Sequence, residues 1–302
     1  MAGENMLQHI LFSQILANPW RHSQTARGLG QALVVCALAL GVAWLGNLRR
    51  LELGRETAVA LARGLGQMLA IGLVLVWLLK GAAWWSIPAL ATMCAMAARM
   101  AQSRLQARAR AAGSGAANNA AKKKANQGSN ASANDLPHGY WICLRAIGAG
   151  SAVVIASMTL TGVIGWKATA LVPLGSMIIA SSMNTCTQVL ERYASDLRLN
   201  AGRVEAALAL GASSTEAALP YARNATGAAL IPSLNSLRSL GIVWIPGFAA
   251  GMLLTGSDPV YTAIYQFVVI AMIYAASGVT ALVAASGYER AAFEEERLVR
   301  VR

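Results

Sequence analysis

The chain has 302 residues, of which 56% are hydrophobic and only 13% are charged, and this composition excludes an ordinary soluble protein. A net charge of +12, from 25 basic and 13 acidic residues, also occurs in nucleic-acid-binding proteins. Here, however, the basic residues lie between apolar runs and form no continuous binding face. We therefore expect an all-α polytopic membrane protein with no nucleic-acid partner.

The first part of the chain predicts an interfacial segment followed by three membrane spans. Within residues 1–29, apolar side chains recur on one helical face, which is typical of a helix lying on the membrane surface. The spans are expected within residues 30–109, the last two joined by a tight turn at Gly81-Ala82, where Trp84 and Trp85 suit the membrane surface. The expected ranges are 30–48, 64–80 and 83–100.

A change of composition marks the middle of the chain. Residues 110–137 are rich in Ala, Gly, Ser, Asn and Lys and show no apolar periodicity, so we expect a disordered basic linker. The lysines at 122–124 are suited to contact with anionic lipid headgroups, and a purely solvated linker is the alternative.

Residues 138–287 are expected to hold spans four to seven and a long cytoplasmic loop. The fourth and fifth spans cover about 140–165 and 169–190, the loop covers 191–226, and the seventh span covers about 260–285. A charged cytoplasmic tail is expected at 288–302.

The sixth expected span, 234–254, contains Pro246-Gly247 in its middle. A proline inside a helix removes one backbone hydrogen bond and clashes with the preceding turn, so this span should kink or break. Freed backbone groups are tolerated in a membrane only where protein or a water-filled cavity satisfies them. The sixth span is therefore expected to face a pathway.

The distribution of Lys and Arg predicts the orientation of about seven spans. Most of the 25 basic residues fall in the loops of one side, whereas the opposite side has Arg21, Arg27, Lys80 and Lys167. By the positive-inside rule, the N-terminus lies outside or in a lumen and the C-terminus lies in the cytoplasm.

The residue types argue against catalysis by this chain. No Gly-Lys dipeptide occurs, so no Walker A loop is present, and no carboxylate falls within an expected span. The four cysteines lie in or beside apolar runs without CxxC spacing, so we interpret them as small buried hydrophobic residues. We expect no catalytic residue, no metal site and no cofactor on the chain.

The loop between the fifth and sixth spans predicts two short helices with a bend. Residues 205–210 are strong helix formers, Gly211 is a typical C-terminal stop, and Ser213 to Glu216 is a capping sequence for a second helix. An ordinary amphipathic loop helix would show the same local pattern.

Several motifs together resemble a known family. They are Leu234-Asn235-Ser236, Gly241-Ile242-Val243, Pro246-Gly247, Asp258-Pro259 and Tyr265-Gln266. This set is similar to the paired last spans of the FetB/YbbM-type ABC transporter permeases, which are linked to iron export in bacteria and to aluminium tolerance in plants. Residues 204–213 also resemble the EAA motif of ABC permeases, whose short cytoplasmic helix docks on the ATPase.

The resemblance implies a permease subunit of an ABC exporter, working as a homodimer or permease heterodimer with a separate ATPase that binds ATP and Mg. The implied coupling residues are Glu205, Ala206, Ala207 and Gly211. The substrate-pathway candidates combine this resemblance with the polar and thioether residues of the spans, for which helix-to-helix contact is the alternative role. These candidates are Met183, Asn184, Gln188, Asn235, Pro246, Gly247, Met252 and Gln266.

The substrate that the resemblance suggests is iron, another metal or a small polar solute. The pathway candidates offer amides and thioethers and no carboxylate, so a tightly held bare ferric ion is not expected. A non-transporting membrane scaffold that retains the permease fold is the alternative function.

Overall fold

The computed structural model describes residues 35–41, 59–68, 70–72, 83–120, 139–162 and 168–293. For residues 108–120, 168 and 169 it describes the backbone alone. The chain divides into two units, Met1–Trp77 and Leu78–Arg302. Throughout the described ranges, regular secondary structure is helical. This agrees with the expected all-α class.

The first unit contains helical backbone at 35–41, 59–68 and 70–72. These stretches overlap the first two expected spans, and the second begins before the expected residue 64. The interfacial segment 1–29 and the remainder of both spans lie outside the described residues.

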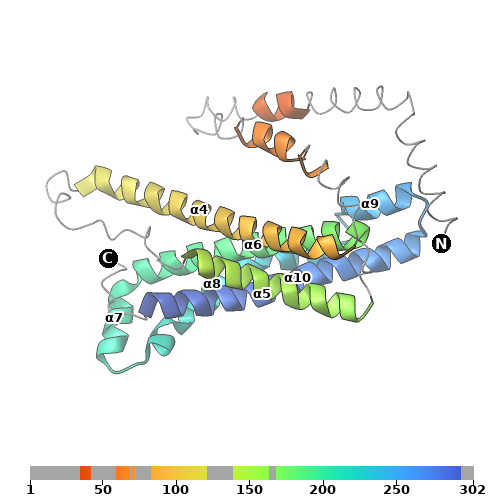
Figure 1. Cartoon of the computed structure of the whole chain (residues 1–302). Helices are drawn as coiled ribbons and strands as arrows, with labels where there is room; N and C mark the ends of the chain where they lie inside the picture. Colours follow the sequence, from red (N-terminus) through yellow and green to blue (C-terminus); the bar gives the residue numbers. More distant parts are fainter. Residues whose placement is uncertain are drawn as a thin grey trace. The chain divides into compact units, whose positions relative to one another are not determined.

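The second unit is a bundle of long helices (Figure 1). A short 3₁₀ helix, η1, precedes the first of them. The elements are η1 (Ala83–Trp85), α4 (Ser86–Ala120), α5 (Gly139–Leu160), α6 (Ala168–Leu199), α7 (Ala201–Ala209), α8 (Ser214–Ser239), α9 (Gly247–Leu254) and α10 (Pro259–Phe293).

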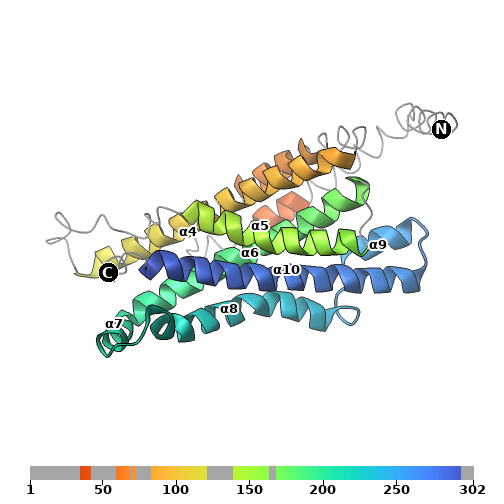
Figure 2. The ribbon, with the colours of Figure 1, turned by 60° about the horizontal axis from the view of Figure 1, so that its bottom comes forward.

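Helices α6 and α10 form the centre of this unit. Figure 2 shows α10 lying between α5 and α8, and both of these helices contact it along their length. Helix α6 packs against α4, α5, α8 and α10. Many of the core residues are alanines, among them Ala98, Ala101 and Ala281, each 0% exposed. Small side chains allow helices to approach closely, which is how helices without a hydrophobic driving force associate in membranes.

Two described helices are long and apolar enough to cross a membrane, α5 and α10, with 22 and 35 residues. Both begin where the fourth and seventh spans are expected, but α5 ends at Leu160, before the expected 165, and α10 continues to Phe293, beyond the expected 285. Helices α6 and α8 carry charged residues such as Arg192 and Arg223, which lower their mean hydropathy. The count of seven spans therefore stays a prediction.

The segment 191–226, expected as a loop, is mainly helical. Helix α6 continues beyond the expected end at 190 to Leu199, and α8 begins at Ser214. The apolar pattern ends at about 190, but polar residues on the outer face of a packed helix do not interrupt its backbone hydrogen bonds. The expected cytoplasmic segment is thus built from the ends of two long helices and the short α7.

The break in the expected sixth span is present, but it begins before the proline. Helix α8 ends at Ser239, and α9 begins at Gly247 with Pro246 as its N-cap. Gly241 has a φ of +76°, in the left-handed region that glycine adopts without strain. The expectation of one span over 234–254 is therefore corrected to the end of α8, a turn and the separate helix α9.

Helix α4 extends into the segment expected to be disordered. It ends at Ala120, so helical backbone covers the first residues of 110–137. Alanine has the highest helix propensity of the amino acids, and this stretch is alanine-rich, so it can continue a helix without an apolar face. Residues 121–137 and the tail from 294 lie outside the described residues.

Candidate functional site

The end of α7 is fixed by a glycine-dependent cap. Gly211 has a φ of +91°, its N–H donates to the Leu208 carbonyl at 3.0 Å, and the Ala212 N–H donates to the Ala207 carbonyl at 3.1 Å. These two bonds are those of a Schellman motif, which ends a helix and reverses the chain direction. The predicted stop at Gly211 is confirmed.

The start of α8 is fixed by a reciprocal cap at Ser213, two residues after Gly211. The Glu216 N–H donates to the Ser213 hydroxyl at 3.2 Å, and the Ser213 N–H donates to the Glu216 carboxylate at 2.9 Å. The Ser213 hydroxyl also donates to this carboxylate, at 2.8 Å. The bond from the Ser213 N–H, and to a lesser extent the bond from the hydroxyl, lowers the pKa of the Glu216 carboxyl. The predicted capping sequence is confirmed, and α7 and α8 form a hairpin with two defined ends.

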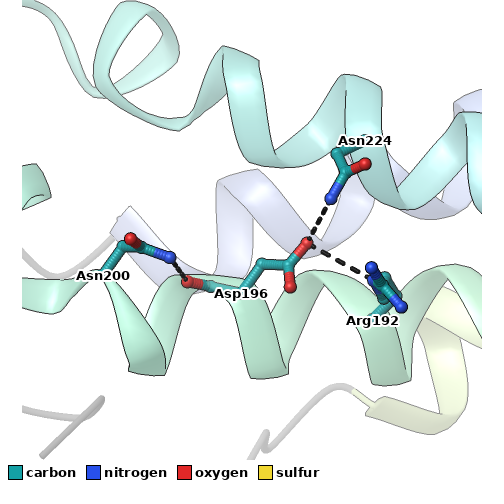
Figure 3. Close-up of polar contacts among 4 residues, drawn as sticks. All are labelled: Arg192, Asp196, Asn200 and Asn224. Carbon is teal, nitrogen blue, oxygen red and sulfur yellow. Dashed lines mark hydrogen bonds and ion pairs between the residues drawn. The ribbon is translucent and has the colours of Figure 1, made fainter.

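An acidic residue at the end of α6 holds this hairpin to the bundle (Figure 3). The Asn224 side-chain amide, on α8, donates to the Asp196 carboxylate at 2.9 Å. Arg192 lies 3.6 Å from the same carboxylate oxygen, and the Asn200 side chain donates to the Asp196 backbone carbonyl at 2.9 Å. The contact between Asp196 and Asn224 thus joins α6 to α8 beside the point where α7 begins.

The predicted coupling residues lie on this hairpin. Ala206 is exposed, Glu205 and Ala207 are half-buried, and Ala207 packs against the bundle core. Two leucines flank α7: Leu199, the last residue of α6, is 80% exposed, and Leu210, the C-cap of α7, is 89% exposed. The segment around α7 therefore presents apolar side chains that no described residue covers.

The polar pathway candidates on α6 lie on one exposed face. Asn184 and Gln188 are both exposed and are separated by one helical turn, with Arg192 one turn further on. The Asn184 side-chain oxygen accepts a hydrogen bond of 3.4 Å from Arg104 on α4. Because Asp196 contacts α8, the exposed α6 face runs between α4 and α8.

The other candidates are distributed over different places. Asn235 is exposed on α8, Pro246 and Gly247 stand at the start of α9, and Met252 is half-buried on α9. Half-buried Met183 packs against the bundle core. The structure thus gathers Asn184 and Gln188 on one face. No described contact links the five candidates of this paragraph to that face.

Gln266 is buried on α10 without a described hydrogen-bond partner. It is 3% exposed, and neither its side-chain oxygen nor its nitrogen is bonded. Thr262, one turn earlier, is 2% exposed and has an unbonded hydroxyl. Burying an unbonded amide costs about 1–3 kcal/mol, so these atoms are suited to a water or solute group.

A hydroxyl cluster that the sequence did not indicate joins three helices. The Ser277 hydroxyl on α10 lies 3.0 Å from that of Ser181 on α6 and 3.3 Å from that of Ser233 on α8. Helical periodicity shows that a serine lies in a span but not which neighbouring helix its side chain meets. The alternative role of helix-to-helix contact therefore applies to these serines.

Among the described residues, no three side chains of the His, Cys, Asp or Glu type come together as a metal site. The structure therefore offers no closed tetrahedral site of the zinc type in the ranges that it describes.

The bundle is made of long, alanine-packed helices, two of which are apolar enough to cross a membrane, and relatives that are named as membrane proteins indicate an integral membrane protein of the helical class. A family model described as Uncharacterised protein family (UPF0014) matches residues 29–293, and the chain belongs to this family. This confirms the resemblance that the sequence motifs indicated.

Curated relatives match part of the chain. Protein ALUMINUM SENSITIVE 3 of Arabidopsis thaliana is 25% identical over 150 residues, 50% of this chain and 55% of the relative. UPF0014 membrane protein slr1647 of Synechocystis is 29% identical over 103 residues, 34% of this chain and 40% of the relative. Probable iron export permease protein FetB of Escherichia coli is 23% identical over 139 residues, 46% of this chain and 54% of the relative. The chain thus spans about half the length of these relatives, and no solved structure matches it.

Proposed function

We propose that the chain is the membrane permease subunit of an ABC-type exporter, driven by a separate ATPase. The observation that carries this proposal is the α7–α8 hairpin, which has a fixed cap at each side of its bend and an exposed leucine, Leu210, with exposed Leu199 just before α7. A coupling element must be rigid enough to transmit a displacement and apolar enough to bind a partner. The name of the FetB relative, an iron export permease, supports the same function.

The partner would be an ATPase that receives α7 in a cleft. Glu205, Ala206 and Ala207 form the docking helix in this proposal, and Gly211 supplies the bend. ATP and Mg would bind to the partner. Helix α7 lies between α6 and α8 in the chain, and the Asp196–Asn224 hydrogen bond joins those two helices, so a displacement of α7 would reach both of them.

The pathway in this proposal follows the exposed face of α6. Amide side chains are poorly suited to contact with lipid tails, so the face that carries Asn184 and Gln188 is expected to line an aqueous path or a permease dimer. Arg192, one turn further on, falls in the expected cytoplasmic segment. The proposed cargo is a metal, with iron first, or a small polar solute. Neutral amides bind such a cargo weakly enough to release it.

The first experiment tests the partner. Co-expression with each candidate ATPase of the host should yield a complex that co-purifies in detergent and hydrolyses ATP. A chain that recruits none of them would contradict the proposal and favour the alternative, a non-transporting membrane scaffold.

The second experiment tests the bend. Gly211→Pro should abolish transport while membrane insertion and basal ATP hydrolysis persist, because proline cannot adopt a φ of +91° and lacks the N–H that bonds Leu208. Gly211→Asn is the matched control, since asparagine tolerates the left-handed region and keeps the N–H. Transport at the wild-type rate in Gly211→Pro would exclude 204–213 as the coupling element.

The third experiment concerns the cargo. Deleting the gene and measuring cellular metals beside small polar metabolites should show which class accumulates. Accumulated iron would support the first choice, and accumulated polar conjugates the second. Accumulation of neither would favour the scaffold.

A further inference from the structure

Two cysteine thiols meet in the core of the second unit. Cys143 on α5 and Cys186 on α6 are both 0% exposed, and their side chains lie within hydrogen-bonding reach of each other. Cys143 lies near the start of α5 and Cys186 in the second half of α6, so the two residues are far apart in the sequence. Their spacing in the sequence gives no indication of this contact, which arises from the packing of α5 on α6.

Further sulfur atoms lie against the same core cluster as this thiol pair. Cys94 of α4 and Met183 of α6 are half-buried and pack against the same core cluster as Cys143 and Cys186. The Cys94 sulfur lies 3.9 Å from the position that a Cβ would take on Gly148, so it faces α5. Met183 precedes Cys186 by three residues and therefore lies on the same side of α6.

The ligand types select one class of metal ion. Thiolate and thioether sulfur bind soft ions such as Cu(I), whereas hard ions require oxygen ligands. A two-coordinate monovalent ion needs only a pair of facing thiolates, so the absence of any larger ligand group among the described residues does not conflict with it.

We propose that Cys143 and Cys186 together bind one monovalent soft cation of the copper(I) class, and that the Met183 thioether lies on its entry route. The ion enters as Cu⁺, both thiols lose their protons to solvent, and the product is a bis-thiolate complex with one negative charge. No electron is transferred. Metal binding therefore releases two protons per ion and ties α5 to α6. This site does not depend on a partner ATPase, so it stands or falls separately from the proposed function.

The test is a Cu(I) titration of the full-length, reduced chain in detergent without oxygen, in competition with bathocuproine disulfonate. We expect one copper per chain, a sulfur-to-copper charge-transfer band in the near ultraviolet, and release of protons as copper binds. Absence of competitive binding by the wild-type chain overturns the proposal, whatever the behaviour of the variants.

The variants assign the ligands. Cys143→Ser and Cys186→Ser should each weaken copper binding by at least about tenfold, because losing a residue that merely hydrogen-bonds to a metal ligand already lowers affinity by that factor. Met183→Leu should slow copper uptake and leave the stoichiometry at one ion. Cys36→Ser, in the first unit, is the matched control and should bind copper like the wild type. Circular dichroism and monodisperse elution identify variants that fold. A folded Cys143→Ser/Cys186→Ser double variant that retains the ion would overturn the assignment.

Discussion

Gly150 on α5 shows how closely two helices of this bundle approach. A Cβ at this position would lie 2.7 Å from the Ala276 carbonyl oxygen and in closer contact with the Thr280 hydroxyl, both on α10. Two residues earlier on α5, a Cβ on Gly148 would meet only the Cys94 sulfur, at an ordinary 3.9 Å. The two glycines therefore have different roles, although the sequence shows them as equivalent small residues.

Replacing each glycine by alanine tests this difference. Gly150→Ala should destabilise the protein by about 1–3 kcal/mol, because the added methyl group meets the α10 backbone, which cannot rotate away. Gly148→Ala should be neutral or stabilising by up to about 1 kcal/mol, the helix-propensity gain of alanine over glycine. Thermal unfolding in detergent measures both, and equal melting temperatures would contradict the close α5–α10 contact.

The hydrogen bond between Asp196 and Asn224 is expected to contribute more to the free energy of unfolding than the ion pair between Asp196 and Arg192. Asp196→Ala removes the acceptor of the Asn224 amide, and hydrogen bonds to charged groups contribute about 1.5–3 kcal/mol. The Arg192 side chain is 56% exposed, so Arg192→Ala should cost at most about 1 kcal/mol. Melting temperatures of both variants and of Asn224→Ala check this order. Should Arg192→Ala prove the more damaging change, the contact with Asn224 would not be the main one.

At the scale of elements, the α7–α8 hairpin combines two caps of different sensitivity. The glycine cap of α7 depends on backbone conformation and is independent of pH. The capping box of α8 depends on an ionised Glu216, which accepts from the Ser213 N–H and hydroxyl. The start of α8 is therefore the part of the hairpin that responds to acid.

The pH dependence of this cap has a defined sign. Because the folded-state pKa of Glu216 is lowered below the ordinary 4.5, its ionised form stabilises the folded state above that value. This contribution should be lost as the pH falls through the folded-state pKa. Melting curves of the wild type and of Glu216→Gln, recorded on both sides of 4.5, should therefore converge at acidic pH and differ by a constant amount at neutral pH. A difference that does not change with pH would contradict the role of the carboxylate.

At the scale of the whole molecule, the charge distribution predicts which side each turn faces. A Thr215→Cys change in the α7–α8 hairpin should resist a membrane-impermeant thiol reagent added from outside, whereas Ser257→Cys before α10 should react. Both are made in a chain whose own four cysteines are replaced. The segment 191–226, which contains this bend, carries Arg192, Arg198, Arg203 and Arg223, and the positive-inside rule places it in the cytoplasm. Labelling in the opposite pattern would reverse the orientation.

The sequence by itself determined the features that depend on residues close together in the chain. The apolar runs predicted where α5 and α10 begin, and Gly211 and the Ser213–Glu216 pair predicted the two caps. A cap is formed by residues within about one turn of each other, so its residue types suffice to predict it. The motifs also indicated the family that the family model confirmed.

Tertiary structure decided which faces of the helices meet. It buried Gln266, left Asn184 and Gln188 exposed, joined Asp196 to Asn224, and brought Cys143 to Cys186. It also placed the break of the sixth span before Pro246 and extended α6 and α8 into the expected loop from its two sides. Periodicity defines the faces of each helix, but the partner of each face is set by the packing of all the helices together, which no local pattern encodes.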